Sequence, residues 1–144
     1  LQGKIAVASA KLAYDRFQKI FAGERWERLA RHGARPHRPL WASTSTKNPA
    51  YPDTLYVDSL VGANTVNTMP PKTMEAFLDH GSVAVTVTSD LQTARAQVAR
   101  LAERGIDLDA ITQKLQDDGV AAFARSFESL LSSIGEKCRA LRGN

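Results

Sequence analysis

Cysteine is nearly absent from this sequence of 144 residues, which contains only Cys138. A single cysteine excludes an internal disulfide and any paired-cysteine metal or redox site, and it predicts a reducing, cytoplasmic location. Long apolar runs are absent too. None approaches the roughly 18–20 residues of a membrane-spanning helix, so we expect no membrane insertion. No signal peptide is evident, and because the chain begins at Leu1 without a Met, we expect it to have been cut or trimmed.

Histidines are few and are not spaced like metal ligands. His32, His37 and His80 form neither an HxH nor an HExxH pattern, so we predict no metal site. His32 and His80 each precede a glycine at the end of a predicted helix, where a cation interacts favourably with the helix dipole. Cys138 has no neighbouring base in the sequence, and we expect it to be unreactive.

Acidic residues are scarce in the first third of the chain. Residues 1–50 contain ten Lys and Arg against three Asp and Glu, a balance of +7, whereas residues 51–144 contain nine against twelve, a balance of −3. A basic excess attracts anions, either a nucleic acid or a small phosphorylated molecule. A solvated, Arg-rich helical surface explains the same excess without any ligand. The residues alone leave these interpretations open.

Apolar residues at spacings of three and four predict a mostly helical chain. Glycines and prolines divide the pattern into separate helices. The predicted helices are 3–22; 24–32; a helix from Pro71 to Gly81; one that follows Ser89-Asp90 and ends at Gly105; a short one capped by Asp107 or Asp109, with Ile111 and Leu115 inward, that ends at Gly119; and a last one carrying Val120, Phe123, Phe127, Leu130, Leu131 and Ile134.

Strand signals are few and short. Residues 40–43 predict a strand buried on both faces, and residues 64–69 predict another. Residues 54–61 fit either a strand or a short helix, and the alternation over 83–88 suggests an extended segment. Strands that alternate with helices favour a parallel α/β architecture. Because a closed (β/α)8 barrel needs about 250 residues, we expect the C-terminal portion of such a barrel, with its last two or so parallel strands and a helix-rich tail. We treat residues 1–144 as a single segment.

Two blocks of the sequence resemble the C-terminal part of transaldolases. The more specific block is RPLWASTSTKNPAYPDTLYVDSLVGANTVNTMP, residues 38–70, and the second is GIDLDAITQKLQDDGVAAFARSFESLL, residues 105–131. The upstream segments KLAYDRFQKIF and ERWERLARHGARPHRPLWAST look like the same family. The resemblance covers nearly the whole chain, in the order expected.

The resemblance implies a class I aldolase-type (β/α)8 barrel. Such enzymes are transferases of the pentose phosphate pathway, in carbohydrate metabolism, that move a dihydroxyacetone unit between sugar phosphates through a lysine Schiff base, with no metal or organic cofactor. The implied substrates are sedoheptulose 7-phosphate, fructose 6-phosphate, erythrose 4-phosphate and glyceraldehyde 3-phosphate. In the family the lysine and both catalytic carboxylates precede the segment matched here. The resemblance therefore implies no catalytic residue in this chain, and we expect the full-length parent to be active and this chain alone to be inactive.

The same resemblance suggests a phosphate-binding role for the segment WASTSTK, which is similar to the seventh barrel strand and its loop. Ser43, Ser45 and Lys47 fall at or beside the family's serine and basic positions, and which serine contacts phosphate stays open. A phosphate dianion favours hydroxyl donors with a cation, and Lys47 would act as a point charge. From the residues alone, Lys47 is better explained as an exposed loop lysine, and the hydroxyl run as local backbone hydrogen bonding.

A second hypothesis is a helical module without enzymatic activity that binds a partner or a nucleic acid through its basic N-terminal third. No RNA-binding pattern of interleaved aromatic and basic residues supports nucleic-acid binding, so we predict none. A barrel fragment leaves apolar strand faces uncovered, so we expect self-association.

Overall fold

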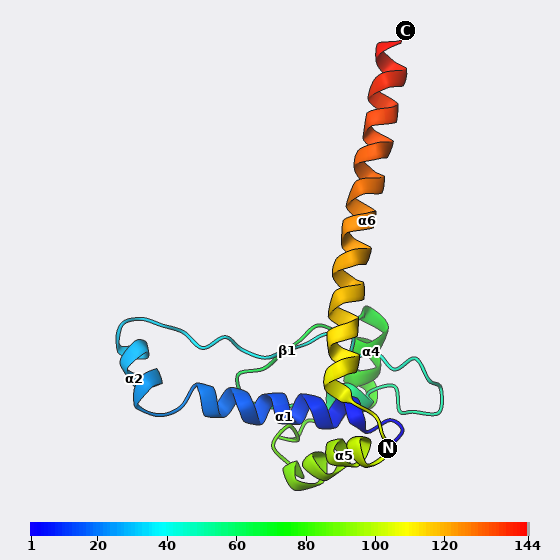
Figure 1. The fold of residues 1–144 in the computed structure, drawn as a ribbon. Coiled ribbons are helices and arrows are strands. Elements are labelled where there is room, and N and C mark those ends of the chain that lie inside the picture. The colour runs from blue at the N-terminus through cyan, green and yellow to red at the C-terminus, as the bar shows by residue number, and fades with distance from the viewer. Residues whose placement is uncertain (144) are drawn as a thin grey trace. The chain divides into compact units, whose positions relative to one another are not determined.

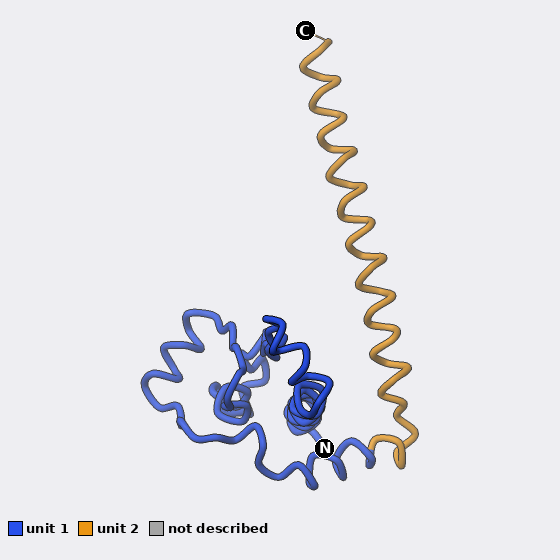
Figure 2. The backbone as a smooth tube through the Cα atoms, turned by 90° about the vertical axis from the view of Figure 1, so that its left-hand side faces the viewer, with its two compact units in different colours: residues 1–100 blue, residues 101–144 orange. Residues whose placement is uncertain are grey.

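The computed structural model describes residues 1–143, which divide into two compact units, residues 1–100 and the remainder from Leu101 (Figure 2). The described residues are mostly helical (Figure 1). The elements in chain order are α1 (Ile5–Ile20), α2 (Glu24–Arg31), β1 (Leu40–Trp41), α3 (Leu55–Asp58), β2 (Val66–Asn67), α4 (Pro71–His80), α5 (Leu91–Glu103) and α6 (Leu108–Arg142). No helix within residues 1–143 combines the length and the apolar character needed to cross a membrane.

The two strands form a parallel pair, with Leu40 opposite Val66 and Trp41 opposite Asn67. Both predicted strands are confirmed in position, and α3 resolves the ambiguous segment 54–61 as a helix. The prediction that the first strand is buried on both faces is wrong, because Leu40 is 53% exposed. Each strand has only one neighbouring strand within the described residues, so the outer edge of each has no partner strand there.

The core of residues 1–100 lies where α1 packs against the connections around the sheet. Tyr14, Leu60 and Val87 form its buried centre, and Phe17 and Trp41 pack against them. The Tyr14 hydroxyl donates to the carbonyl oxygen of Ala63 at 2.9 Å, which satisfies its buried polar end. Val87 is completely buried because the chain at Gly62 approaches it closely. A Cβ at Gly62 would lie 2.2 Å from Val87 Cγ1.

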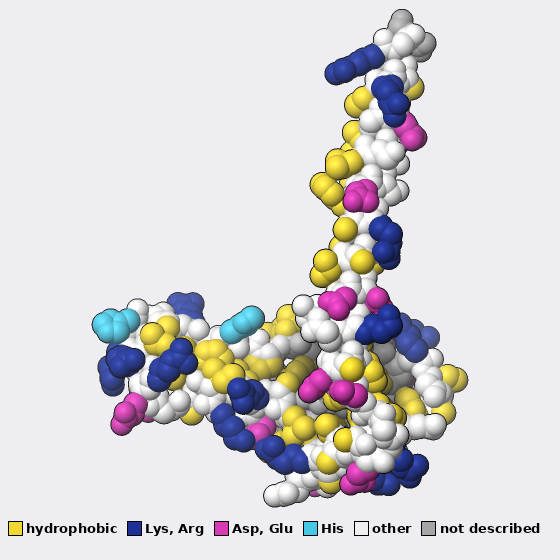
Figure 3. All heavy atoms as spheres, viewed as in Figure 1, with side chains coloured by type: hydrophobic (Ala, Val, Ile, Leu, Met, Phe, Trp, Pro, Cys, Tyr) yellow, Lys and Arg dark blue, Asp and Glu magenta, His cyan; other side chains and the backbone are white. Residues whose placement is uncertain are grey.

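Several predicted helices are confirmed. The segments 3–22 and 24–32 contain α1 and α2, and α4 begins with Pro71 in its first turn. Helix α5 starts at Leu91, directly after the predicted Ser89-Asp90 signal. The exposed arginines of α2 account for part of the basic surface (Figure 3).

Three sequence predictions fail in the second half of the chain. The two helices predicted around Gly119 are one helix, α6, capped by Asp107, whose Oδ1 accepts from the backbone N–H of Ala110 at 3.0 Å. Ile111 and Leu115, predicted to face inward, are 45% and 65% exposed. Residues 83–88 form no strand, because the backbone N–H groups of Thr86 and Val87 both donate to the single carbonyl of Val61 and a turn follows.

Candidate functional site

The loop that follows β1 carries the hydroxyl run, and one of its members has a structural role. Thr44 is 3% exposed, and its Oγ1 donates to Asn67 Oδ1 at 2.9 Å and lies 3.4 Å from the Thr68 carbonyl oxygen. This contact joins the carboxyl ends of the two parallel strands. Asn67 and Thr68, at the carboxyl end of β2, are engaged in this link. The next residues along the loop are thereby held at the carboxyl edge of the sheet.

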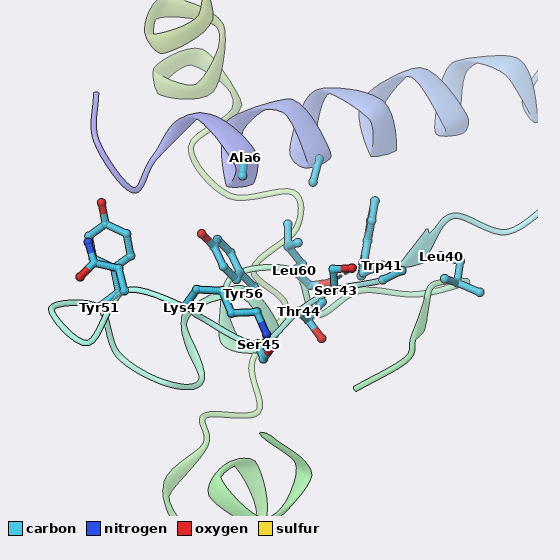
Figure 4. A pocket seen from close by; sticks show the side chains of 13 residues that line it. Ala6, Leu40, Trp41, Ser43, Thr44, Ser45, Lys47, Tyr51, Tyr56 and Leu60 are labelled. Carbon is cyan, nitrogen blue, oxygen red and sulfur yellow. Dashed lines mark hydrogen bonds between the residues drawn. The ribbon is translucent and has the colours of Figure 1, made fainter. Parts of the chain in front are cut away.

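Ser43, Ser45 and Lys47 line one pocket of about 580 Å³. Figure 4 shows these side chains below the first turns of α1, with Trp41 and Leu60 nearby. Ser43 has a φ of 56°, in the left-handed region that is costly for a residue other than glycine, so the chain turns sharply as it leaves β1. The structure therefore brings the three residues singled out from the sequence to one place.

Lys47 is free to meet an anion. Its side chain is exposed, and none of the ion pairs within residues 1–143 includes it. An ammonium group beside hydroxyl donors is a suitable environment for a phosphate or carboxylate. The contacts around Lys47 are therefore compatible with anion binding.

A second pocket of about 650 Å³ lies on the other side of the same loop and shares Ser45 and Lys47 with the first. Lys72 and Thr73, from the first turn of α4, also line it. Neither residue is predicted as a site residue from the sequence. The signal that could have found them is Pro70-Pro71, which marks a helix start directly after the second strand of a parallel pair.

A histidine anchors the far end of the loop. His80 Nε2 lies 2.9 Å from Asp53 Oδ1, and His80 Nδ1 lies 3.0 Å from Asp79 Oδ2. The hydrogen bond to Asp53, and next the one to Asp79, raise the pKa of His80 to about 8. The same bond with His80 lowers the pKa of Asp53. His80 is the last residue of α4, as predicted, so a positive charge on its ring interacts favourably with the helix dipole. Its hydrogen bonds to Asp53 and Asp79 stabilise the same charge.

Two further hydrogen bonds reinforce this anchor. Thr54, 3% exposed, donates from Oγ1 to Asp58 Oδ2 at 2.6 Å, and Asp58 Oδ1 accepts from the backbone N–H of Ser82 at 2.9 Å. The loop is therefore fastened by Thr44 at its start and by Asp53 and Thr54 at its end. Within residues 1–143, no three His, Cys, Asp or Glu side chains converge as metal ligands would. Cys138 is exposed on α6.

Comparison with known proteins gives a family match over residues 1–134, to the model described as Transaldolase/Fructose-6-phosphate aldolase. The chain is 51% identical over 138 residues to a transaldolase of Parafrankia sp. (strain EAN1pec), covering 95% of this chain and 37% of that protein. It is 48% identical over 134 residues to a transaldolase of Neisseria meningitidis serogroup A, covering 93% and 38%. It is also 48% identical over 140 residues to transaldolase 1 of Streptomyces avermitilis, covering 96% and 37%.

The chain thus spans somewhat more than a third of the length of the relatives that it matches, and the matched region is their C-terminal part.

Proposed function

Since this chain belongs to the transaldolase and fructose-6-phosphate aldolase family, we propose that it supplies the phosphate-binding end of a transaldolase active site. The parent enzyme would transfer a dihydroxyacetone unit between sugar phosphates through a lysine Schiff base. The Schiff-base lysine would come from outside this chain. The observation that carries the proposal is the convergence of Ser43, Ser45 and Lys47 on one pocket at the carboxyl end of β1.

The proposed architecture is a (β/α)8 barrel in which β1 and β2 are the last two strands. It is supported by their parallel pairing and by the helix α3 between them, because parallel neighbours joined through a helix are the repeating unit of such barrels. Ligands of these barrels bind at the carboxyl ends of the strands. The loop that begins at Ser43 leaves β1 from that end.

In this placement, the bond-breaking group and the phosphate-binding groups come from different parts of the parent enzyme. The iminium formed on the parent's lysine acts as the electron sink that stabilises the carbanion left by cleavage of a carbon–carbon bond. The hydroxyls of Ser43 and Ser45 and the ammonium of Lys47 would hold the distant phosphate. Holding a remote group orients the reacting carbons and so lowers the entropic part of the barrier.

The proposal extends to substrates, pathway and location. The sugar phosphates would be sedoheptulose 7-phosphate, fructose 6-phosphate, erythrose 4-phosphate and glyceraldehyde 3-phosphate, in the pentose phosphate pathway. A cytoplasmic location and a reaction that needs no added cofactor remain parts of the proposal. The alternative of a nucleic-acid or partner-binding helical module is not favoured, because the family match covers residues 1–134, including the basic N-terminal third.

Substitution of Lys47 tests the proposed function. In the full-length parent, Lys47→Ala should raise the KM for fructose 6-phosphate about tenfold or more, because a hydrogen bond to a charged group is lost, and it should lower kcat less. Steady-state kinetics with Ser43→Ala and Ser45→Ala would identify the serine that contacts phosphate. Lys4→Ala, at the start of α1, is the matched control for loss of a surface charge. An unchanged KM in the Lys47 variant would remove this residue from the phosphate site.

A further inference from the structure

The first turn of α4 borders the loop that carries Lys47. Helix α4 begins only four residues after the end of β2, as their bounds Asn67 and Pro71 show. The bond from Thr44 Oγ1 to Asn67 Oδ1 holds the end of β2 against the loop after β1. The pocket of about 650 Å³ lies between these segments, with Ser45 and Lys47 on one side and Lys72 and Thr73 on the other.

The surroundings of the Thr73 hydroxyl suggest a bound ligand. It is 6% exposed, yet the structure gives its hydroxyl no hydrogen-bond partner within residues 1–143. Over the same residues, no fully buried side-chain nitrogen or oxygen lacks a partner. The Thr73 oxygen is therefore not sealed off from solvent, and Thr73 lines this pocket. A nearly buried threonine at a pocket wall, whose hydroxyl has no partner within residues 1–143, is available to bind a ligand.

The backbone of α4 adds donors beside this hydroxyl. Pro70 occupies the N-cap position and no side chain caps the helix. Pro71 has no N–H, and the N–H of Met74 is the first to pair, with the carbonyl oxygen of Pro70 at 3.0 Å. The N–H groups of Lys72 and Thr73 are thus the free donors at the positive end of a ten-residue helix. Such an end favours an anion.

The charges around the pocket are consistent with this preference. Lys47 and Lys72 contribute two ammonium groups from opposite sides. Asp53 is the acidic residue among those that line the pocket, and its Oδ1 is held by His80 Nε2 at 2.9 Å. The net charge of the side chains that line the pocket is therefore positive.

We propose that the Thr73 hydroxyl, the free N–H groups of Lys72 and Thr73 and the Lys72 ammonium form a second wall of the phosphate site, opposite Ser45 and Lys47. The ligand is a phosphate monoester, the phosphate end of the sugar. This inference rests on the proposed function for the identity of the sugar. It assigns binding residues to the start of α4 that the resemblance to transaldolases did not indicate.

The experiment compares a substrate with and without its phosphate. In the full-length parent, the ratio of kcat/KM for fructose 6-phosphate to that for fructose should fall about tenfold or more in Thr73→Val, since a hydrogen bond to a charged group is removed. Thr73→Ser, which keeps the hydroxyl, should restore most of the ratio. Lys72→Gln should lower it, whereas Lys4→Gln, which removes the same charge elsewhere, should not.

Titration with inorganic phosphate gives a readout independent of turnover. The backbone amide resonances of Lys72 and Thr73 should shift with phosphate concentration in the unmodified protein, and the midpoint should move to higher concentration in Thr73→Val. This readout applies to Lys72→Gln as well, so the test survives if the Val variant fails to fold.

The outcomes separate the two proposals. If Lys47→Ala lowers the ratio while the variants at positions 72 and 73 do not, and both amides stay still, the second wall is wrong and the proposed function stands. If the parent turns over neither sugar but phosphate shifts both amides and Thr73→Val weakens that response, the anion site stands and the proposed function falls. If phosphate moves neither amide and no variant alters the ratio, both are wrong.

Discussion

Neighbouring hydroxyl residues in this loop have different surroundings despite their similar chemistry. Ser43, Thr44 and Ser45 all line the pocket beside α1, but of the three Thr44 alone is buried, and its hydroxyl joins the two strands. The backbone at Ser43, with φ of 56°, rotates the following side chains relative to the strand. The four consecutive hydroxyl residues predict a polar loop. Which of them has a structural role depends on Asn67, 23 residues away from Thr44, because Asn67 accepts the hydrogen bond.

At the same scale, His80 should make the stability of the protein depend on pH. Its folded-state pKa, about 8, lies above the ordinary value of 6.5, so the protonated form is the one that the fold favours. The contribution of His80 is fully present below pH 6.5 and is lost as the pH rises through about 8. The melting temperature should therefore fall between pH 6.5 and 8.5 in the unmodified protein, and this fall should be smaller in His80→Gln.

The pKa of Asp53 is shifted in the opposite direction, and substitution of Asp53 tests whether its bond with His80 causes the alkaline fall. Its lowered pKa means that its contribution is present above its ordinary value of 3.8 and is lost on acidification below that value. Asp53→Asn removes the first partner of His80 and should reduce the alkaline fall in melting temperature as well. If the melting temperature of His80→Gln and of Asp53→Asn fell as steeply as that of the unmodified protein, the pH dependence would belong to other groups. All three partners are at least half exposed, so we expect the effect to be modest and weaker at high salt.

At the scale of elements, the sequence predicted positions better than lengths and burial. The helices α1, α2, α4 and α5 follow from local patterns and from Gly and Pro signals, which act within one turn. Burial could not be predicted in the same way, because it depends on partners distant in sequence or absent from the chain. The apolar Leu78 of α4 is 78% exposed, whereas Thr73 is the buried residue of that helix.

Helix α6 shows why a glycine is an ambiguous signal. In the sequence, Gly119 favours two separate helices, because glycine is common directly after the end of a helix. The structure continues one helix through Gly119, which is not among the residues with positive φ. A hydrogen-bonded helix tolerates a single glycine at a cost of about 1 kcal/mol.

Substitution at this position tests the continuous helix. Beyond the adjacent residues and the backbone of α6 itself, no heavy atom lies within 4 Å of the position of a Cβ at Gly119, so Gly119→Ala should raise the helicity measured by circular dichroism and stabilise α6 by about 0.5–1 kcal/mol. Gly62→Ala provides the contrast, because its Cβ would collide with the buried Val87, and it should destabilise by about 1–3 kcal/mol. A loss of stability in Gly119→Ala would mean that this glycine ends one helix and begins another.

For the whole molecule, the blocks 38–70 and 105–131 predict the family, and the family match covers residues 1–134. Composition and periodicity alone reached only an α/β chain too short to close a barrel. The two parallel strands agree with that expectation, and within the described residues neither strand has a second neighbouring strand. The candidate site was predictable in part. The loop residues lie in one specific block, whereas Lys72 and Thr73 join them only through the pairing of β1 with β2.

Exposed apolar side chains lead to a prediction about assembly. Phe123, Phe127 and Ile134 of α6 are 82%, 61% and 48% exposed, and Figure 3 shows hydrophobic side chains along this helix. With Val120 and Leu130 they recur at intervals of three and four residues, the spacing by which one helix pairs with another. We therefore expect two copies of the isolated chain to associate through α6, because such a face is costly to leave in water.

Sedimentation velocity over a range of micromolar concentrations should show the mass of the isolated chain rising with concentration. Phe127→Glu should shift the distribution toward the monomer, since a carboxylate in an apolar helix seam would be desolvated without a partner. Leu40→Glu, at the exposed face of β1, tests the alternative that the uncovered strand is the contact. If Leu40→Glu alone dissociates the assembly, the association belongs to the sheet. A compact monomer at every concentration would contradict both, and would require these side chains to find cover within their own chain.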